Sequence, residues 1–262
     1  MPHNIFTPSP PVSSVWKTRI RHLARHIFQS RCHSCGIPME HDATHIPFSS
    51  KLQLCPACHK RLAPRRNGFC PICGHMEPDE IPSPATFCTA CREHRPACAN
   101  VVFYGCYEDL MRDHILRFKF AGDFASGRLL AHCMINAWLT RKLPEKPNVL
   151  VPIPLHPTRL RQRGFNQSLE LCRHLRSALQ LPISSSAIRR IRQTTPQSQL
   201  SASQRHTNLI NAFQTNPNRV VRKIVLLIDD VATTNSTLEE AAQALLRAGA
   251  TRVLALVAAK AQ

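Results

Sequence analysis

Short, uninterrupted apolar segments alternate with amphipathic ones from about residue 99 to the C-terminus. The apolar segments are rich in β-branched residues, which is typical of strands buried on both faces of a parallel sheet. They are 101–107, 149–154, 187–191, 223–228 and 252–259. Helical periodicity between them predicts helices over 108–118, 125–142 and 167–179, a helical or mixed segment over 203–213, and a last helix that ends at Arg247. The alternation predicts an α/β fold with a doubly wound, mainly parallel sheet.

The apolar segment 223–228 stops at two adjacent acids, Asp229 and Asp230, and a hydroxyl-rich loop follows, comprising Thr233, Thr234, Asn235, Ser236 and Thr237. We expect this loop at the carboxyl end of a parallel strand, where open α/β sheets bind ligands. Free N–H groups at the start of a helix bind phosphate, and adjacent carboxylates accept hydrogen bonds from a diol or hold Mg²⁺ through water. The alternative is a strand with an acidic end and an ordinary capped helix.

This string resembles the phosphoribosyl pyrophosphate (PRPP) motif of the type I phosphoribosyltransferases, in which an apolar strand, two acids and a Thr/Ser/Gly-rich loop follow one another. The resemblance implies the type I phosphoribosyltransferase fold for residues 99–262. Asn235 stands where that pattern usually has glycine. Asparagine tolerates left-handed backbone geometry better than most residues, so the loop shape can persist.

Eight of the twelve cysteines form four Cys-x2-Cys pairs, which are Cys32 with Cys35, Cys55 with Cys58, Cys70 with Cys73, and Cys88 with Cys91. In a reducing compartment this spacing indicates structural zinc rather than disulfides. The pairs, taken in order, predict two four-cysteine sites, whereas an interleaved arrangement has the same composition and stays open. We therefore expect a cysteine-rich zinc-binding module over residues 31–98. His33, His59 and His75 adjoin the pairs, but eight thiolates make further ligands unnecessary.

Composition points to a polyanionic partner and to the cytoplasm. The net charge is +18, and between Arg159 and Lys223 basic residues outnumber acids twelve to one. Such a surplus favours a nucleic-acid surface, although it also serves solubility. No apolar run is long enough to cross a membrane, and residues 1–12 lack a secretory core. Residues 1–30 predict a basic amphipathic helix that packs on the zinc module or docks on a membrane surface.

A second basic segment leaves the end of an apolar strand. It contains three prolines, Arg159, Arg161 and Arg163, and Gly164 before a helix. Arginine binds phosphate oxygens in a bidentate manner, which suits a pyrophosphate. A plain basic surface loop is the alternative.

With this segment the chain resembles the ComF/GntX family over most of its length, through the cysteine pairs, the run Phe118 to Asp123, and the stretch 192–200 followed by Arg205, Asn208 and Phe213. The resemblance implies that 192–213 is a hood loop over PRPP, with an ordinary long loop as the alternative. It implies that Asp229 and Asp230 hold the ribose hydroxyls and Mg²⁺, that residues 233–237 hold the 5′-phosphate, and that the three arginines flank the pyrophosphate. Lys119 and Arg205 contribute charge.

The resemblance implies a role in DNA uptake and natural transformation, with PRPP, single-stranded DNA and proteins of the uptake machinery as partners. A turning-over phosphoribosyltransferase with an unidentified nitrogenous acceptor is the alternative, and a zinc-ribbon adaptor with a vestigial transferase fold is a third. No residue indicates a general acid or base, because positioning and leaving-group stabilisation by Mg²⁺ suffice for this reaction. Stacking on bases would fall to Trp16, Phe118, Phe120 and Phe165.

Overall fold

The structure is a computed structural model that describes residues 31–39, 46–49, 52–76, 87–192 and 212–261. Two compact units divide the chain, residues 1–57 and 58–262, and each is described by itself. The predicted N-terminal helix over 1–30 and most of the predicted hood loop, with Arg205, lie outside the described residues. The division into an N-terminal segment, a zinc-binding module and a phosphoribosyltransferase-like domain, with boundaries after residues 30 and 98, stays a prediction.

The first unit contains one small antiparallel sheet and the cysteines Cys32, Cys35 and Cys55. Strand β1 (Ile46–Ser49) pairs with β2 (Leu52–Leu54). The turn that carries Cys32 and Cys35 is tied to this sheet, because the backbone N–H of His33 donates to the Gln53 carbonyl at 3.0 Å. Helix α2 (Pro56–Arg61) begins directly after Cys55.

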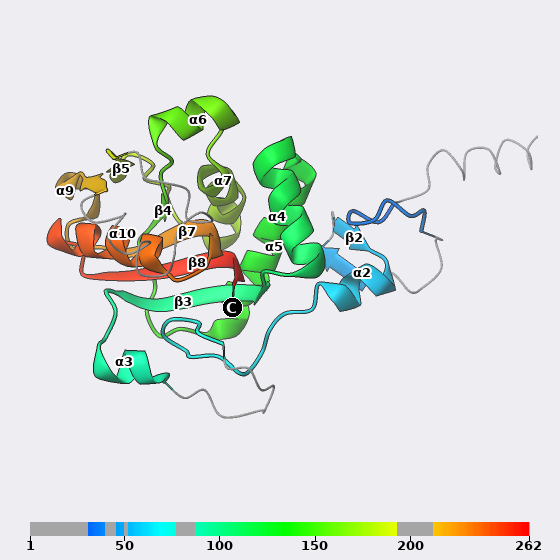
Figure 1. The fold of residues 1–262 in the computed structure, drawn as a ribbon, viewed down its shortest axis with the longest axis horizontal. Helices are drawn as coiled ribbons and strands as arrows, with labels where there is room; N and C mark the ends of the chain where they lie inside the picture. The colour runs from blue at the N-terminus through cyan, green and yellow to red at the C-terminus, as the bar shows by residue number, and fades with distance from the viewer. Residues whose placement is uncertain (1–30, 40–45, 50–51, 77–86, 193–211, 262) are drawn as a thin grey trace, which may run out of the picture. The chain divides into compact units, whose positions relative to one another are not determined.

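Four parallel strands form the central sheet of the second unit (Figure 1). Their order is β3 (Cys98–Cys106), β8 (Arg252–Lys260), β7 (Ile224–Ala232) and β4 (Val149–Pro152), and each neighbouring pair is parallel. Most residues of these strands are buried, as the uninterrupted apolar pattern predicted. The predicted α/β class with a mainly parallel sheet is confirmed.

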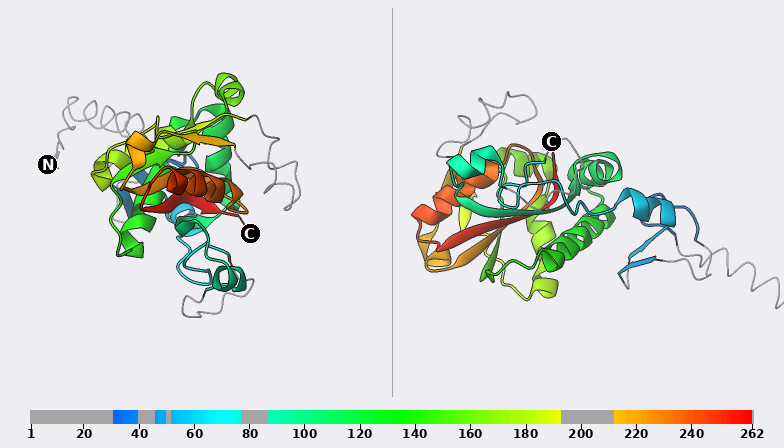
Figure 2. Two further views of the ribbon diagram at one scale, coloured as in Figure 1. Left: turned by 90° about the vertical axis from the view of Figure 1, so that its left-hand side faces the viewer. Right: turned by 90° about the horizontal axis from the view of Figure 1, so that it is seen from below.

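Helices cover both faces of this sheet (Figures 1 and 2). Helix α10 (Ser236–Arg247) buries Leu238, Ala241 and Leu245 against Val225 and Leu227 of β7. Because side chains alternate along a strand, the neighbouring residues of β7 face the opposite side. That side is covered by α5 (Phe124–Arg141) and α7 (Gln167–Leu179), and α4 (Asp109–Ala121) packs on α5. Among the described residues no helix is long and apolar enough to span a bilayer.

Smaller elements complete the unit. They are α3 (Thr89–Glu93), α6 (Pro157–Arg163), α9 (Pro217–Val220) and the antiparallel pair β5 (Ile188–Arg190) and β6 (Phe213–Thr215). Three elements differ from the sequence-based expectation. The predicted strand 187–191 corresponds to β5, which pairs with β6 outside the central parallel sheet. The predicted basic loop contains helix α6, and β7 continues through Asp229 and Asp230 instead of ending before them.

Candidate functional site

A cavity of about 950 Å³ lies at the carboxyl ends of β4 and β7. Seven of the side chains predicted to bind PRPP line it, namely Lys119, Arg159, Arg163, Asp229, Asp230, Thr233 and Thr237. Arg161, Thr234, Asn235 and Ser236 do not line it, and Arg205 lies outside the described residues. The cavity therefore unites the two segments that the sequence analysis singled out separately, at the edge where parallel sheets bind ligands.

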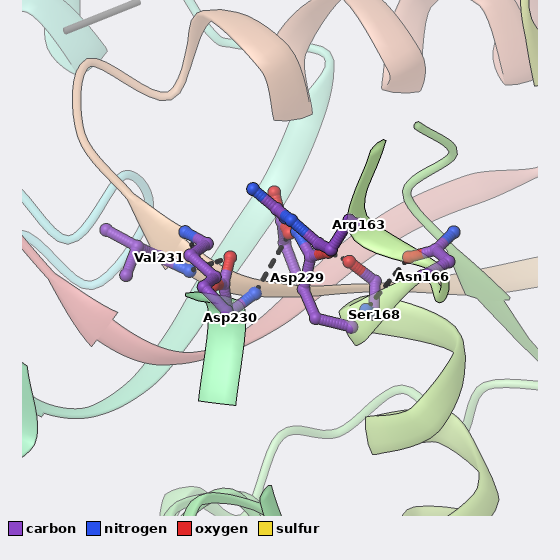
Figure 3. A network of polar contacts seen from close by, with 8 residues as sticks. Arg163, Asn166, Ser168, Asp229, Asp230 and Val231 are labelled. Atoms are coloured by element: carbon purple, nitrogen blue, oxygen red, sulfur yellow. Dashed lines mark hydrogen bonds and ion pairs between the residues drawn. The ribbon is translucent and has the colours of Figure 1, made fainter. Parts of the chain in front are cut away.

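Asp229 is held in place by the first turn of helix α7 (Figure 3). The Ser168 hydroxyl donates to Asp229 Oδ1 at 2.9 Å, and the backbone N–H of Asp230 donates to the same oxygen at 2.9 Å. Ser168 is itself fixed by the helix cap, because Asn166 Oδ1 accepts its backbone N–H at 3.0 Å. One carboxylate oxygen is thus used for positioning, and the residue lines the cavity.

Asp230 is nearly inaccessible, with its side chain 2% exposed. Its Oδ1 accepts the backbone N–H of Val231 at 3.0 Å, and its Oδ2 lies 2.5 Å from Lys119 Nζ. A buried carboxylate needs such a partner, since an isolated charge is costly away from water. The ion pair connects β7 to the last turn of α4 beside the cavity.

The two carboxylates have an unusual electrostatic relation. Burial, and after it the adjacent Asp230 charge, raise the pKa of Asp229 to about 7, although Lys119 opposes both effects. Near neutral pH the site therefore holds a carboxyl that ionises readily when a cation arrives. This behaviour fits residues that hold Mg²⁺ through oxygen ligands.

Three arginines on two elements line the same cavity, Arg159 and Arg163 on α6 and Arg190 on β5. Burial, and after it the neighbouring Arg159, lower the pKa of Arg190 to about 10, although Asp229 opposes both effects. Burial also lowers the pKa of Arg159, with Arg163 as the second cause. These cations repel one another, so an anion bound between them would relieve the repulsion.

The short helix α6 presents these arginines because its ends are well defined. Pro157 occupies the first turn, where proline costs no hydrogen bond, and His156 Nδ1 accepts the Thr158 N–H at 3.3 Å. Gly164 ends the helix in the left-handed region with a φ of 81°. Arg163 donates from Nη1 to Gln167 Oε1 at 2.7 Å and lines the cavity, whereas Arg161 is exposed.

The loop 233–237 leads into helix α10, and the free N–H groups at the start of this helix can bind an anion. Asn235 has left-handed geometry with a φ of 63°. Its side chain does not cap the helix and donates instead from Nδ2 to the carbonyl of Cys73 at 2.6 Å. The hydroxyls of Thr234 and Ser236 lie 2.7 Å apart.

Aromatic side chains also line the cavity. Phe120 is 74% exposed and Phe124 is 47% exposed, and both line the cavity with Phe165. The Phe165 ring centroid lies 5.2 Å from that of Phe124, and the Arg163 guanidinium lies 5.4 Å from the centre of the Phe120 ring. Large exposed aromatics beside a charged cavity suit a planar ligand.

The eight paired cysteines form two groups in consecutive order, Cys32, Cys35, Cys55 and Cys58, and then Cys70, Cys73, Cys88 and Cys91. Within each group the sulfur atoms lie within 4.8 Å of one another. The interleaved arrangement is thereby excluded. The separations of 3.8 Å between Cys35 and Cys55 and 3.6 Å between Cys73 and Cys88 match a tetrahedron with metal–sulfur bonds of about 2.3 Å.

The ionisation of these thiols also fits a metal. Burial opposes ionisation of Cys70, but backbone N–H groups outweigh it and lower the pKa to about 7. Burial raises the pKa of Cys73 to about 11, and the charge of Cys70 adds to this effect. Four thiolates at this distance need a cation to be stable, so both groups can hold metal ions.

Comparison with known proteins gives one consistent result. The chain is 33% identical over 205 residues to "Competence protein F" of Haemophilus influenzae, with 76% of this chain and 87% of that protein covered. It is 36% identical to "DNA utilization protein YhgH" of Escherichia coli K12 and 31% identical to "Competence protein ComFC" of Bacillus subtilis, over 93% and 79% of those proteins and 76% and 75% of this chain. This chain belongs to the ComF family.

The predicted family is thereby confirmed, although no family model matches the chain. A solved structure titled "Structure of the allosteric regulatory enzyme of purine biosynthesis" covers 50% of this ComF-family chain and 25% of its own, with 16% identity and a TM-score of 0.33. That likeness is too low to carry an argument about the site.

Three residues of the site carry no signal in the sequence: Phe124 and Arg190 line the cavity, and Ser168 holds Asp229. Ser168 and Phe124 lie at helix starts, and nothing in the local sequence indicates that they face Asp229 or the cavity. Arg190 was counted only as part of the basic surplus, because β5 carries no motif that marks a ligand site. All three become visible only once the strands and helices bring them together.

Proposed function

We propose that this ComF-family protein binds PRPP with Mg²⁺ in the cavity at the ends of β4 and β7. The observation that carries the proposal is the union of two acids, Asp229 and Asp230, with four cations around one cavity. The cations are Lys119, Arg159, Arg163 and Arg190. A ribose bearing both a phosphate and a pyrophosphate needs this combination, because its diol requires acceptors and its phosphates require cations.

Each group has a separate part in this binding. Asp229, with one oxygen held by Ser168, would accept the ribose hydroxyls and hold Mg²⁺, and Asp230 would stay paired with Lys119. The bound Mg²⁺ would neutralise the pyrophosphate. Arg159, Arg163 and Arg190 would contact the pyrophosphate oxygens, and the N–H groups of the loop 233–237 would contact the 5′-phosphate.

A matched pair of arginines tests the PRPP part. Arg163→Gln removes a charge from the cavity, whereas Arg161→Gln removes one from the exposed side of the same helix. By calorimetric titration we expect Arg163→Gln to weaken PRPP binding by about 10- to 100-fold, the usual loss for a charge-assisted hydrogen bond. Arg161→Gln should leave it unchanged. Equal effects of both variants would contradict this position of the pyrophosphate.

We further propose that the protein binds single-stranded DNA in DNA uptake. The names of its relatives, "Competence protein F" and "DNA utilization protein YhgH", support this role. So do the net charge of +18 and the exposed Phe120 beside Arg163, since aromatics and arginine are the groups on which unpaired bases stack. Proteins of the uptake machinery are expected partners, and the paired, reduced cysteines favour a cytoplasmic location.

The DNA proposal is tested by fluorescence anisotropy with oligo-dT across a salt series. Binding through phosphates must weaken steeply as salt rises, and Arg161→Gln should reduce that slope by about one. Phe120→Leu should weaken binding, with Phe87→Leu as the control. Phe87 is also exposed (43%) and also lies beside an arginine, Arg95, at 5.5 Å, but it does not line the cavity. Equal losses in the two phenylalanine variants would contradict stacking at the cavity.

An active phosphoribosyltransferase is the alternative function. The same residues would serve it, because the cations that bind the pyrophosphate would also stabilise it as the leaving group. The aromatic side chains that line the cavity favour a planar nitrogenous base as acceptor. Pyrophosphate release measured across a panel of bases decides: release that depends on one base supports turnover, and PRPP binding without release supports a binding protein.

The two cysteine groups are proposed to hold zinc. Four thiolates in a tetrahedron leave no open coordination position, so the ions would be structural and would take no part in the chemistry of the cavity.

A further inference from the structure

The second cysteine group lies directly against the loop proposed to bind the 5′-phosphate. Asn235 donates from Nδ2 to the carbonyl of Cys73 at 2.6 Å, although the two residues are 162 positions apart in the chain. Cys73 is one of the four ligands of that group. The middle of the phosphate loop is thus attached to the backbone of a metal-binding turn.

This bond replaces the usual use of an asparagine at a helix start. Asn235 stands at the N-cap of α10, yet it makes no capping bond with its side chain. Its left-handed φ of 63° is uncommon for a residue with a side chain. The hydrogen bond to Cys73 supplies a reason for the asparagine, because a glycine would adopt the same backbone geometry but would have no amide to reach the turn.

A lysine makes a second connection between the loop and the end of the sheet. Lys260 of β8 is buried and donates from Nζ to the carbonyl of Thr233, and also to that of Ala261 at 3.2 Å. The turn containing Gly74 packs on the same region, since a Cβ on Gly74 would meet the Phe103 ring at 3.0 Å and Lys260 Cδ at 3.7 Å. Gly74 therefore packs closely against side chains of β3 and β8.

The other half of the cysteine group is connected to the same helix. Glu239, in the first turn of α10, accepts the backbone N–H groups of Ala97 and Cys98 at 2.8 and 3.2 Å. These residues follow helix α3, which carries Cys91. Both cysteine pairs of the second group are therefore linked to the start of α10, one through Asn235 and one through Glu239.

We infer that the metal ion of the second group positions the phosphate loop. The ion fixes the turn at Cys73 and the segment after Cys91, and these two segments hold the start of α10 through Asn235 and Glu239. Without the ion, the turn and the segment after Cys91 are less constrained, and the start of α10 is held less firmly. Asn235 is thus a positioning residue that connects the metal group to the cavity. The consequence for ligand binding rests on the proposed PRPP site, whereas the consequence for loop order does not.

Hydrogen exchange of the full-length protein, followed by mass spectrometry, tests the inference without any ligand. Cys88→Ser empties the second group but keeps Cys73, and Cys35→Ser is the matched change in the first group. We expect Cys88→Ser to speed exchange in the peptide over residues 233–240 by about tenfold or more, the effect of losing one hydrogen bond or more. Cys35→Ser should not change that peptide.

A second variant keeps the inference testable where Cys88→Ser unfolds the unit, which would show as lost protection in helix α7. Asn235→Gly keeps the left-handed geometry and the zinc content but removes the bond to Cys73. It should speed exchange over 233–240 as well. Removal of the metal ions with a chelator should then speed exchange of this peptide less than it does in the wild type. Unchanged exchange in Asn235→Gly would overturn the inference.

PRPP with Mg²⁺ should raise the melting temperature of the protein if it binds. Measuring this rise separates the proposal of PRPP binding from the inference about the metal ion. If the wild type shows no rise but exchange over 233–240 depends on Asn235 and Cys88, the PRPP proposal fails and the inference stands. If the rise is present and neither variant alters it or the exchange, the inference fails and the PRPP proposal stands.

Discussion

Asp229 shows how position changes the chemistry of a common side chain. An exposed aspartate is ionised above about pH 4, whereas burial beside Asp230 raises the pKa of Asp229 to about 7. The folded protein therefore holds a proton that the unfolded chain releases. Because the folded pKa is raised, the contribution of Asp229 to the free energy of unfolding falls as pH rises from about 4 to about 7 and is constant above that range.

This shift predicts a pH dependence of ligand binding. Mg²⁺ binds the ionised carboxylate, so binding of PRPP with Mg²⁺ should release a proton below pH 7. We expect the PRPP-induced rise in melting temperature to be larger at pH 8 than at pH 6. Asp229→Asn should remove this dependence and should make the ligand-free protein more stable at pH 8, because no buried charge then forms. A rise that is equal at both pH values in the wild type would contradict the shifted pKa.

At the scale of elements, the start of helix α7 decides where the acids lie. Asn166 Oδ1 accepts the N–H groups of Ser168 and Leu169, and Asn166 Nδ2 donates to the carbonyl of Ile153 at the end of β4. One side chain thus caps the helix and connects it to the neighbouring strand. The helix start in turn aims Ser168 at Asp229.

Asn166→Ala should therefore affect both stability and binding. Loss of the cap costs about 1 kcal/mol, or about 2–4 °C in melting temperature. Displacement of Ser168 should also weaken PRPP binding. Asn216→Ala, which removes the equivalent cap of helix α9, should destabilise the protein but leave PRPP binding unchanged. Calorimetric titration of both variants checks this, and equal PRPP affinities would show that the cap does not position the site.

The sequence predicted these elements unevenly, for identifiable reasons. Helix α7 was predicted with its observed bounds from its apolar period, and the structure adds Asn166 as its N-cap. Helix α6 was expected to be a loop. It has only seven residues and begins at Pro157, and a segment so rich in proline and arginine shows no helical periodicity. Strand β7 was expected to end before Asp229, because a polar residue inside a parallel strand is not distinguishable from one beyond it.

The same limit applies to the site residues. Lys119, Asp229 and Asp230 were predicted from local motifs and do line the cavity. The exposed Arg161 was not separable from Arg163, because the register of a helix that is not predicted cannot be assigned. Asn235 was identified as the departure from the family pattern, but its contact with Cys73 depends on tertiary structure.

For the whole molecule, the consecutive cysteine groups imply two metal ions per chain. The sulfur separations of 3.6 and 3.8 Å suit zinc in both groups. We expect metal analysis of the protein, purified without chelator, to return about two equivalents of zinc per chain. Cys35→Ser and Cys88→Ser should each lower the value to about one. One equivalent in the wild type would contradict the two-site assignment.

Binding of PRPP with Mg²⁺ at Asp229 and Asp230 is the claim on which the functional account depends, and thermal unfolding tests it. A ligand that binds only the folded state at 100 times its Kd adds about 2.7 kcal/mol to the free energy of unfolding. We predict that PRPP with Mg²⁺ raises the melting temperature of the wild type and of the control Asp113→Asn, an exposed acid on α4 outside the cavity. The double variant Asp229→Asn with Asp230→Asn should show no rise. A rise in the double variant equal to that of the wild type would contradict the assignment of the site.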